Sequence, residues 1–409
     1  MAVADVADVV VVGGGIGGAS LAFALAREGL GVTVLEATLE YEDRVRGESL
    51  LPWGVKEARQ LGVEEIMLDA GAHVAPLWKQ YSEGLGQAGE LPMSRMVDGI
   101  PGALNLRHPA ACQALIEAAA AQGANVVRGV REVKLAGGGS PAVSYVAGAQ
   151  AHEVTASLVV GANGRASTVR KQAGIVLARQ EPISHVAGLL VDGLDDVPDD
   201  HDVTATEGDI MFLMFHQGGG RARLYLVVGA SGQHRFSGPH GTEQFLASCA
   251  LPCQPWSEQV TAAKPAGPCA TYPGDETWTA TPYAEGVVLI GDAAGHNNPI
   301  IGQGLSIALR DARTVRDLVL DGARTPAAFA PYGQERLTRM ERLRLIAEAV
   351  AATRVEDATN RAARRAFLAE KVAAKDPEVF TLLIGAFAGP EIIPDELVRP
   401  DLLDRIRSA

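Results

Sequence analysis

The stretch DVVVVGGGIGGAS, residues 8–20, decides the fold of this chain. Its run of β-branched valines predicts a short strand, and the glycines that follow predict a turn. Alanine and leucine dominate residues 19–28, which predicts a helix, and Gly29 stands where a helix C-terminal cap belongs. The segment VTVLE, residues 32–36, predicts a second strand. Together these segments predict a β-α-β unit.

Three glycines of this turn fit the pattern G-x-G-x-x-G. Gly13 permits the tight turn, Gly15 lets the backbone approach a pyrophosphate, and Gly18 lets the helix lie close to the strand. The helix N-terminus offers unpaired N–H groups and a partial positive charge to phosphates. Glu36 ends the second strand, where a carboxylate can accept hydrogen bonds from ribose hydroxyls. The pattern therefore predicts a dinucleotide-binding site.

A second motif covers residues 287–306, VVLIGDAAGHNNPIIGQGLS. A strand at 286–291 delivers Asp292 to a loop, and the loop leads through Gly302 and Gly304 into a helix at 305–321. The carboxylate can hold a polyol chain, and the glycine-rich helix start can stabilise a developing anion. The ribityl chain and the N1–C2=O edge of a reduced flavin have these needs.

The composition excludes several classes of protein. The 409 residues include 36 Lys and Arg against 49 Asp and Glu, a net charge of −13, which argues against nucleic-acid binding and against an anionic membrane surface. The four cysteines lie far apart or at a spacing of four, with no CxxC pair and no nearby histidine cluster, which predicts free thiols and neither a zinc site nor a disulfide framework. No signal peptide or membrane span is indicated, so we expect a cytoplasmic protein without a metal site.

Differences in composition along the sequence predict more than one domain, with one domain built from two separate segments. Residues 1–175 and 281–332 are expected to form one nucleotide-binding domain, which includes a helix at 109–122 and a strand at 155–162. Residues 176–280 are rich in turns and contain an alternating strand at 221–228, so they predict a separate antiparallel sheet. Their acidic cluster, 192–209, is expected to be a solvated loop. Residues 333–409 predict C-terminal helices, with one helix from 335 to about 375 that packs on the body or forms a homodimer surface.

A third segment, LVVGANGRASTVR at residues 158–170, joins the glycine turn and the 287–306 motif. In this order and spacing, the three segments resemble those of the class A flavoprotein monooxygenases, the para-hydroxybenzoate hydroxylase family. The resemblance covers roughly residues 7–325. It implies an α/β fold in which a Rossmann-type (GR2-like) FAD-binding domain carries an inserted antiparallel β-sheet substrate domain and C-terminal helices.

The resemblance also implies roles for individual residues. Arg46 and Arg107 match arginines that contact the flavin and the FAD phosphate region, and Asp292 matches the aspartate that binds the ribityl chain. On strand 221–228, Arg223 and Tyr225 match an arginine near the flavin and a tyrosine of the substrate cavity. Expected FAD contacts are Gly13, Gly15, Ile16, Gly17, Gly18, Glu36, Ala37, Arg46, Arg107, Val130, Asn163, Gly164, Gly291, Asp292, Pro299, Gly302, Gly304 and Leu305.

Two departures from the family pattern bear on the chemistry. Asn163 replaces the usual aspartate, which puts the handling of the nicotinamide in question. The histidine that usually follows GlyAspAlaAla is replaced by Gly295, with His296 one place later. His296 is the best candidate for proton handling, because histidine titrates near neutral pH. The alternative is a packed or hydrogen-bonded loop histidine without a chemical role. The expected catalytic residues are His296, Pro299, Arg223 and Tyr225.

The resemblance implies an FAD-dependent monooxygenase that uses NADPH or NADH and O2 and acts through a C4a-hydroperoxyflavin. The substrate is expected to be a neutral aromatic or polycyclic molecule, because residues 176–280 contain five basic and thirteen acidic side chains. Two alternatives stay open. The chain could depend on a separate flavin reductase, or it could be a redox-silent FAD-binding protein.

Overall fold

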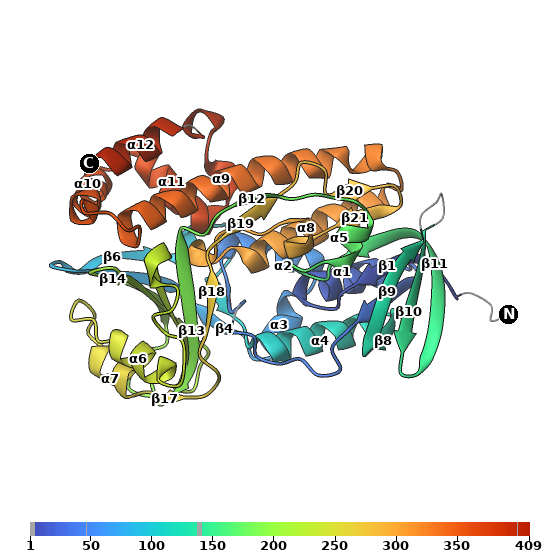
Figure 1. Cartoon of the computed structure of the whole chain (residues 1–409), viewed down its shortest axis with the longest axis horizontal. Coiled ribbons are helices and arrows are strands. Elements are labelled where there is room, and N and C mark those ends of the chain that lie inside the picture. Colours follow the sequence, from blue (N-terminus) through green and yellow to red (C-terminus); the bar gives the residue numbers. More distant parts are fainter. Residues whose placement is uncertain (1–4, 46, 137–140, 399) are drawn as a thin grey trace.

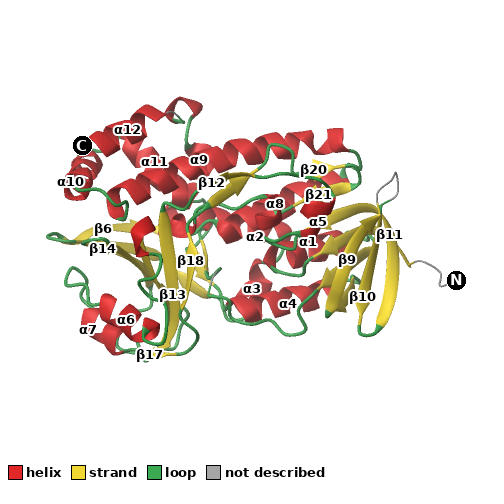
Figure 2. Ribbon diagram, in the orientation of Figure 1, coloured by secondary structure: helices red, strands yellow, loops and turns green. Residues whose placement is uncertain are grey.

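The computed structural model describes residues 5–45, 47–136, 141–398 and 400–409, and Figure 1 traces them from the blue N-terminus to the red C-terminus. Two large sheets lie at opposite ends of the molecule, with several helices between them (Figure 2). The first sheet has the strand order β20-β21-β11-β1-β2-β8, and the pairs from β21 to β8 are parallel. Strands β10 and β9 extend β11 into an antiparallel ribbon.

The valine-rich stretch forms the central strand of the first sheet. Strand β1 (Asp5–Val12) buries Val9 and Val11 against helices α1, α4 and α8, and buries Val10 and Val12 in the cluster on the other face. A strand covered on both faces has to be apolar at every position, which explains the uninterrupted valines. Its neighbours are α1 (Ile16–Arg27) and β2 (Val32–Glu36), so the predicted β-α-β unit is confirmed.

We call the part of the molecule built around the first sheet the first half, and the part built around the second sheet the second half. The remaining elements of the first half surround the β-α-β unit. The strands are β8 (Asn125–Arg128), β9 (Val130–Ala136), β10 (Ala142–Ala147), β11 (Gln150–Gly161), β20 (Tyr283–Ala284) and β21 (Val287–Leu289). A small sheet joins β3 (Ser49–Leu50), β7 (Ala103–Asn105) and β4 (His73–Ala75). The helices are α2 (Pro52–Leu61), α3 (Glu64–Asp69), α4 (His108–Ala121), α5 (Thr168–Gln172) and α8 (Gly304–Leu320).

The second sheet has the order β17-β13-β16-β15-β14-β5-β6, with β18 paired to β13. One face packs on α6 (Gly241–Ser248) and α7 (Ser257–Ala262), and the other packs in a second cluster against the C-terminal helices. Its strands are β5 (Leu77–Ser82), β6 (Gly86–Pro92), β13 (Ser184–Asp192), β14 (His201–Glu207), β15 (Ile210–His216), β16 (Ala222–Gly229), β17 (Lys264–Pro265) and β18 (Ala270–Pro273). A separate ribbon pairs β12 (Ala178–Gln180) with β19 (Glu276–Trp278).

Two details of this half differ from the sequence-based expectation. Strands β5 and β6 come from residues 77–92, inside the segment assigned to the nucleotide-binding domain, and β5 pairs parallel to β14. The second sheet is therefore mixed, not purely antiparallel. The acidic cluster is also only partly a loop, because β14 begins at His201 and buries Asp202 completely.

The described residues of the C-terminal region form four α-helices: α9 (Ala330–Arg354), α10 (Arg361–Ala373), α11 (Pro377–Ala388) and α12 (Pro400–Ser408). The prediction of one helix from 335 to about 375 is wrong, because the chain breaks at residues 355–360. Asp357, Thr359 and Asn360 lie in this break, and such side chains compete with the helix for backbone hydrogen bonds. None of the helices in the described part of the chain has an apolar stretch long enough to cross a membrane.

Candidate active site

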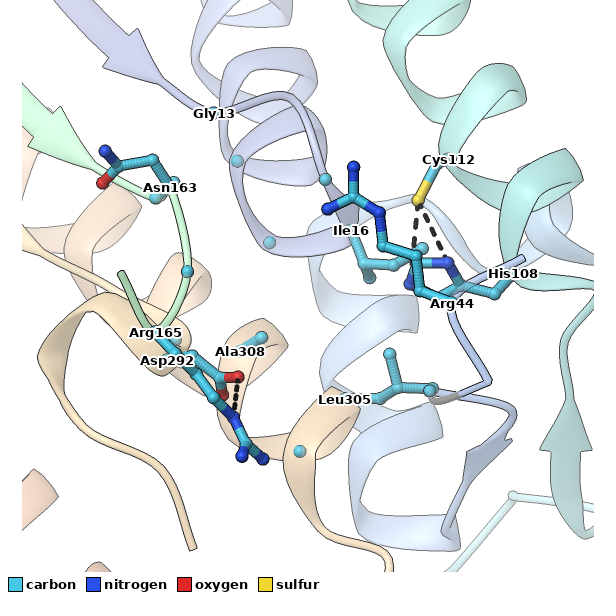
Figure 3. A pocket seen from close by; sticks show the side chains of 18 of the residues that line it. Gly13, Ile16, Arg44, His108, Cys112, Asn163, Arg165, Asp292, Leu305 and Ala308 are labelled. Atoms are coloured by element: carbon cyan, nitrogen blue, oxygen red, sulfur yellow. Dashed lines mark hydrogen bonds and ion pairs between the residues drawn. The ribbon is translucent and has the colours of Figure 1, made fainter. Parts of the chain in front are cut away.

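A cavity of about 770 Å³ lies between the two halves and is lined by residues of both. It begins at the carboxyl ends of β1, β2 and β11, the edge where open α/β sheets bind their ligands. Figure 3 shows the glycine turn, the Asn163 loop and the Asp292 loop facing this space. Expected residues that line it are Gly13, Gly15, Ile16, Gly17, Gly18, Glu36, Ala37, Val130, Asn163, Gly164, Tyr225, Gly291, Asp292, His296, Pro299, Gly302, Gly304 and Leu305.

The glycines of the turn are required by close backbone packing at two positions and open on the cavity at a third. Gly13 has φ +107°, and a Cβ there would lie 2.5 Å from the carbonyl oxygen of Ala162. A Cβ on Gly18 would lie 2.0 Å from the carbonyl oxygen of Gly13. By contrast, a Cβ on Gly15 would meet nothing within 4 Å, because Gly15 faces the cavity. Helix α1 starts there without a side-chain cap or a first-turn acid, so its N–H groups suit a diphosphate.

Glu36 is held rigidly at the end of β2. Its carboxylate accepts hydrogen bonds from the backbone N–H of Gly14 at 2.6 Å and of Thr38 at 2.7 Å. Each carboxylate oxygen keeps a lone pair beyond these contacts, and Glu36 lines the cavity. The arrangement therefore suits a ligand that donates from vicinal hydroxyl groups, such as a ribose.

A buried network of ion pairs and hydrogen bonds holds the Asp292 loop in place. Asp311 on α8 accepts hydrogen bonds from the Gly291 N–H at 2.9 Å and from Arg336 Nε at 2.9 Å. Arg336, on α9, also donates to the carbonyl groups of Gly291, Ala294 and Gly295. Burial acts to raise the pKa of Asp311, but Arg336 and Arg339 outweigh it and the pKa is lowered. Sequence reasoning missed this network, since no motif links residues 291, 311 and 336.

Asn163 keeps its loop in shape without a carboxylate. Its side-chain oxygen accepts a hydrogen bond from the Ser167 hydroxyl at 2.5 Å, and its amide donates to the Thr168 hydroxyl at 3.1 Å. Arg165, two residues later, donates to Asp292 Oδ2 at 3.3 Å, as the dashed line in Figure 3 marks. The loop thus brings a guanidinium group, which the sequence analysis did not single out, to the carboxylate of the second motif.

His296 lines the cavity, but both of its ring nitrogens are occupied. Nε2 lies 3.1 Å from Asp275 Oδ1 and Nδ1 lies 2.9 Å from the Thr277 hydroxyl. Burial lowers the pKa of His296. These contacts hold the loop between Asp292 and Pro299 in place and leave neither nitrogen turned to the cavity. The expected role in proton handling therefore finds no support in this geometry.

The part of the cavity against the second sheet is mostly apolar. Val186, Leu213 and Phe215 line it together with the rings of Tyr225 and Tyr272. Burial raises the pKa values of both tyrosines, which keeps their phenols protonated. We call this part, with its five residues, the chamber. It suits an uncharged ring system better than an anion.

Two of the expected arginines do not line the cavity in the way that the resemblance implied. Arg107 is exposed and donates to the Gln217 carbonyl oxygen at 3.1 Å, and Arg46 lies outside the described residues. Arg223 is buried and paired with Asp43 and Glu48 instead of facing the cavity. Arg44, which the sequence analysis did not single out, lines the cavity near Cys112 (Figure 3).

Cys112 brings a thiol to this site. Cys112 lines the cavity, and burial raises the pKa of its thiol to about 12, so the reactive thiolate is disfavoured. All four cysteines are free. In the described ranges, no three His, Cys, Asp or Glu side chains gather in a way that could hold a metal ion.

Comparisons with known proteins point to one family. The model of the family described as FAD binding domain matches residues 6–345. Squalene monooxygenase SE1 of Panax ginseng is 26% identical over 331 residues, which cover 78% of this chain and 59% of that protein. The 6-methylpretetramide 4-monooxygenase of Streptomyces rimosus is 28% identical over 346 residues, 78% of this chain and 76% of the relative.

The first four curated relatives are longer proteins, of which the matched regions cover 55–66%. Among solved structures, pqsL, a probable FAD-dependent monooxygenase from Pseudomonas aeruginosa, superposes with a TM-score of 0.73 at 22% identity. The superposition covers 88% of this chain and 99% of pqsL. At this identity the likeness establishes the fold.

Proposed function

Because the chain belongs to the FAD binding domain family, we propose that it is an FAD-dependent monooxygenase that inserts oxygen into a neutral aromatic or polycyclic molecule. One observation carries the proposal: a single cavity runs from the glycine turn of α1 to the apolar chamber on the second sheet. A cofactor bound at the turn and a substrate bound in the chamber would therefore share one enclosed space.

The cleft offers a partner for each part of FAD. Glu36 would bind the adenosine ribose, and the uncapped start of α1 would bind the diphosphate. Asp292 would bind the ribityl chain, and the start of α8, which also lacks a side-chain cap, would face the flavin N1–C2=O edge. Bound FAD would supply the redox chemistry, taking a hydride from NADPH or NADH and reacting with O2.

The protein residues would position the substrate and exclude water. Val186, Leu213 and Phe215 give the chamber apolar walls, and Pro299 lies in the loop between the chamber and the Asp292 motif. Excluding water protects a reactive intermediate from hydrolysis and strengthens polar contacts in the site. The names of two relatives specify squalene and 6-methylpretetramide, which supports an apolar or polycyclic substrate.

Asn163 stands where the class A family carries an aspartate, and this difference bears on the source of electrons. Asn163 supplies the loop hydrogen bonds but not the usual negative charge. Direct reduction by NADPH or NADH is the version we propose. The alternative is that the enzyme depends on a separate flavin reductase. The two versions differ in whether NADPH or NADH alone reduces the bound flavin.

Incorporation of labelled oxygen tests the proposed activity. The purified holoprotein would be incubated with NADPH and ¹⁸O₂ against a panel of polycyclic phenols and polyenes, and products would be analysed by mass spectrometry. We expect at least one compound to gain a single ¹⁸O atom. NADPH consumption that yields only hydrogen peroxide, with every compound, would contradict monooxygenation and favour a simple oxidase.

A further inference from the structure

Asp43 and Glu48 flank a short segment of the chain, and both form an ion pair with the buried side chain of Arg223. Arg223 Nη2 donates to Asp43 Oδ2 at 2.6 Å, and Arg223 Nε lies 3.2 Å from Glu48 Oε1. Arg223 is 2% exposed and Glu48 is 3% exposed. Asp43 is half-buried. We call these three residues the clamp. It joins the chain after β2 to strand β16 of the second sheet.

Two described residues between the two acids contribute directly to the cofactor cleft. Arg44 and Gly47 both line the cavity, and Figure 3 shows Arg44 on the side that carries Ile16 and Cys112. Gly47 has φ +81°, and a Cβ there would lie 2.9 Å from the His108 ring. The clamp thus holds a segment that meets the cofactor site on its inner side.

The backbone is strained at Val45. Val45 has φ +56° and is 1% exposed, although a β-branched residue strongly disfavours a positive φ. Its N–H donates to Asp43 Oδ1 at 2.8 Å, so the carboxylate that binds Arg223 also stabilises the strained turn. Strain of this kind persists only where the surroundings compensate for it.

The other end of the clamp reaches the chamber. The Tyr225 hydroxyl donates to Glu48 Oε2, and Tyr225 stands two residues after Arg223 on β16. Gly188 lies opposite Tyr225 on β13, and its lack of a side chain leaves room for Val45 and Tyr225. A Cβ on Gly188 would lie 2.6 Å from Val45 Cγ1 and from Tyr225 Cε1. Cofactor segment and chamber wall are therefore packed on each other through the clamp.

We propose that Arg223 is a positioning residue, held by Asp43 and Glu48, that fixes the strained segment carrying Arg44 in the shape that binds FAD. This role replaces the expected contact of Arg223 with the flavin or the substrate. It rests on the proposed function only in that FAD is the ligand of the cleft. Arg44 would then supply the cation that meets the anionic part of the cofactor.

The charges of the clamp indicate which substitution matters most. Glu48 and Asp43 both raise the pKa of Arg223 against the effect of its burial, and the charge of Glu48 has the larger effect. Asp43 carries the charge that also accepts the hydrogen bond from Val45. Asp43→Asn would remove that charge and weaken the acceptor for Val45. Because Asp43 keeps 24% of its side chain exposed, this variant should still fold.

The test compares FAD affinity among matched variants. Apoprotein of wild type, Asp43→Asn, Arg223→Lys and the double variant would be titrated with FAD while flavin fluorescence is followed. We expect the Kd to rise about ten- to hundredfold in each single variant, the range of one hydrogen bond to a charged group. We expect the double variant to be no more than a fewfold weaker than the singles, since both break the same clamp.

Asp192→Asn is the control, because it breaks the exposed ion pair between Asp192 and Arg221 just before the same strand. Its Kd should equal that of wild type. The visible circular dichroism of saturated holoprotein should change in Asp43→Asn but not in the control, because the flavin environment shifts. Unchanged Kd and dichroism in Asp43→Asn, with only a lowered melting temperature, would give the clamp a purely structural role and overturn the proposal. Failure of wild type to bind FAD would instead contradict the proposed function.

Discussion

Gly13 and Gly15 stand two residues apart in one turn, yet they serve different needs. Gly13 is required by the fold, because its φ is +107° and its α-hydrogen faces the carbonyl oxygen of Ala162. Gly15 has an ordinary φ of −71° and opens on the cavity. The motif that identifies a dinucleotide site therefore mixes a folding requirement with a binding requirement.

We predict that Gly15→Ala weakens FAD binding without weakening the fold. The new methyl group meets no protein atom within 4 Å but occupies space expected for the diphosphate. The Kd for FAD should rise at least about tenfold, the equivalent of ~1.4 kcal/mol. The melting temperature of the apoprotein should stay at the wild-type value in thermal denaturation.

Gly13→Ala is the matched comparison. Its Cβ would lie 2.5 Å from a backbone oxygen, so we expect it to cost roughly 1–3 kcal/mol of stability. A Gly15→Ala apoprotein that melts as early as Gly13→Ala, or that binds FAD normally, would show that this distinction is wrong.

Asp202 provides a second prediction at the level of a single residue. It is completely buried on β14 and accepts a hydrogen bond from the Asn105 amide at 2.6 Å. Burial raises its pKa to about 8, against the opposing effect of that hydrogen bond. In the unfolded chain an aspartate titrates near pH 4. The folded state therefore keeps a proton that the unfolded state loses, and the free energy of unfolding falls as pH rises from about 4 to about 8.

Asp202→Asn should abolish this dependence. The difference in free energy of unfolding, wild type minus variant, should fall by about 2 kcal/mol between pH 6 and pH 8, at ~1.4 kcal/mol per pH unit below the folded pKa. Urea denaturation at pH 6, 7 and 8 measures it. Parallel curves for the two proteins would mean that Asp202 is ionised in the folded state throughout.

Helix α9 is the element that joins the two halves. Near its start, the Tyr332 hydroxyl donates to the Leu289 carbonyl oxygen at the end of β21, and Arg336 holds the Asp292 loop. At its end, Arg354 donates to the Thr206 hydroxyl on β14 of the second sheet. Figure 1 shows this long helix lying across both parts. The helix thus positions the cofactor loop relative to the second sheet.

Arg336→Met should be strongly destabilising, because it leaves Asp311 with one cation and three carbonyl groups without their donor. Removing one member of a buried ion pair costs about 3–5 kcal/mol. Arg405→Gln, which breaks an exposed pair with Glu378 on the outer helices, should cost about 0–1 kcal/mol. Urea unfolding compares the two variants, and equal losses would contradict the role given to the Arg336 network.

The elements that the sequence predicted best are those set by local rules. The glycine turn, the strand ends at Glu36 and Asp292, and the start of α8 each follow from a short pattern, and all line the cavity. Contacts between distant residues were not predictable. Glu48 reaches Arg223 across 175 positions, and no local pattern marks either side chain as a partner. The break after Arg354 was also missed, because alanine and arginine on both sides favour a helix.

At the scale of the whole molecule, the α/β fold with a second sheet and C-terminal helices is confirmed. The resemblance to the class A flavoprotein monooxygenases is confirmed as well, by the family match over residues 6–345 and by relatives named as monooxygenases. The exact division of the chain was harder to predict, since β5 and β6 leave the first half to join the second sheet. A homodimer through the C-terminal helices and a location in the cytoplasm stay predictions.

The most direct measurement is the anaerobic visible spectrum of the purified protein before and after addition of NADPH, and then of NADH, with no other protein present. We expect a bound flavin band that bleaches with one of the two nucleotides, because in the proposed enzyme NADPH or NADH reduces the bound flavin directly. A flavin band that persists with both nucleotides, in the presence of the chamber ligands found by the oxygen-incorporation screen, would contradict direct reduction. A protein that binds no flavin at all would contradict the cofactor assignment itself.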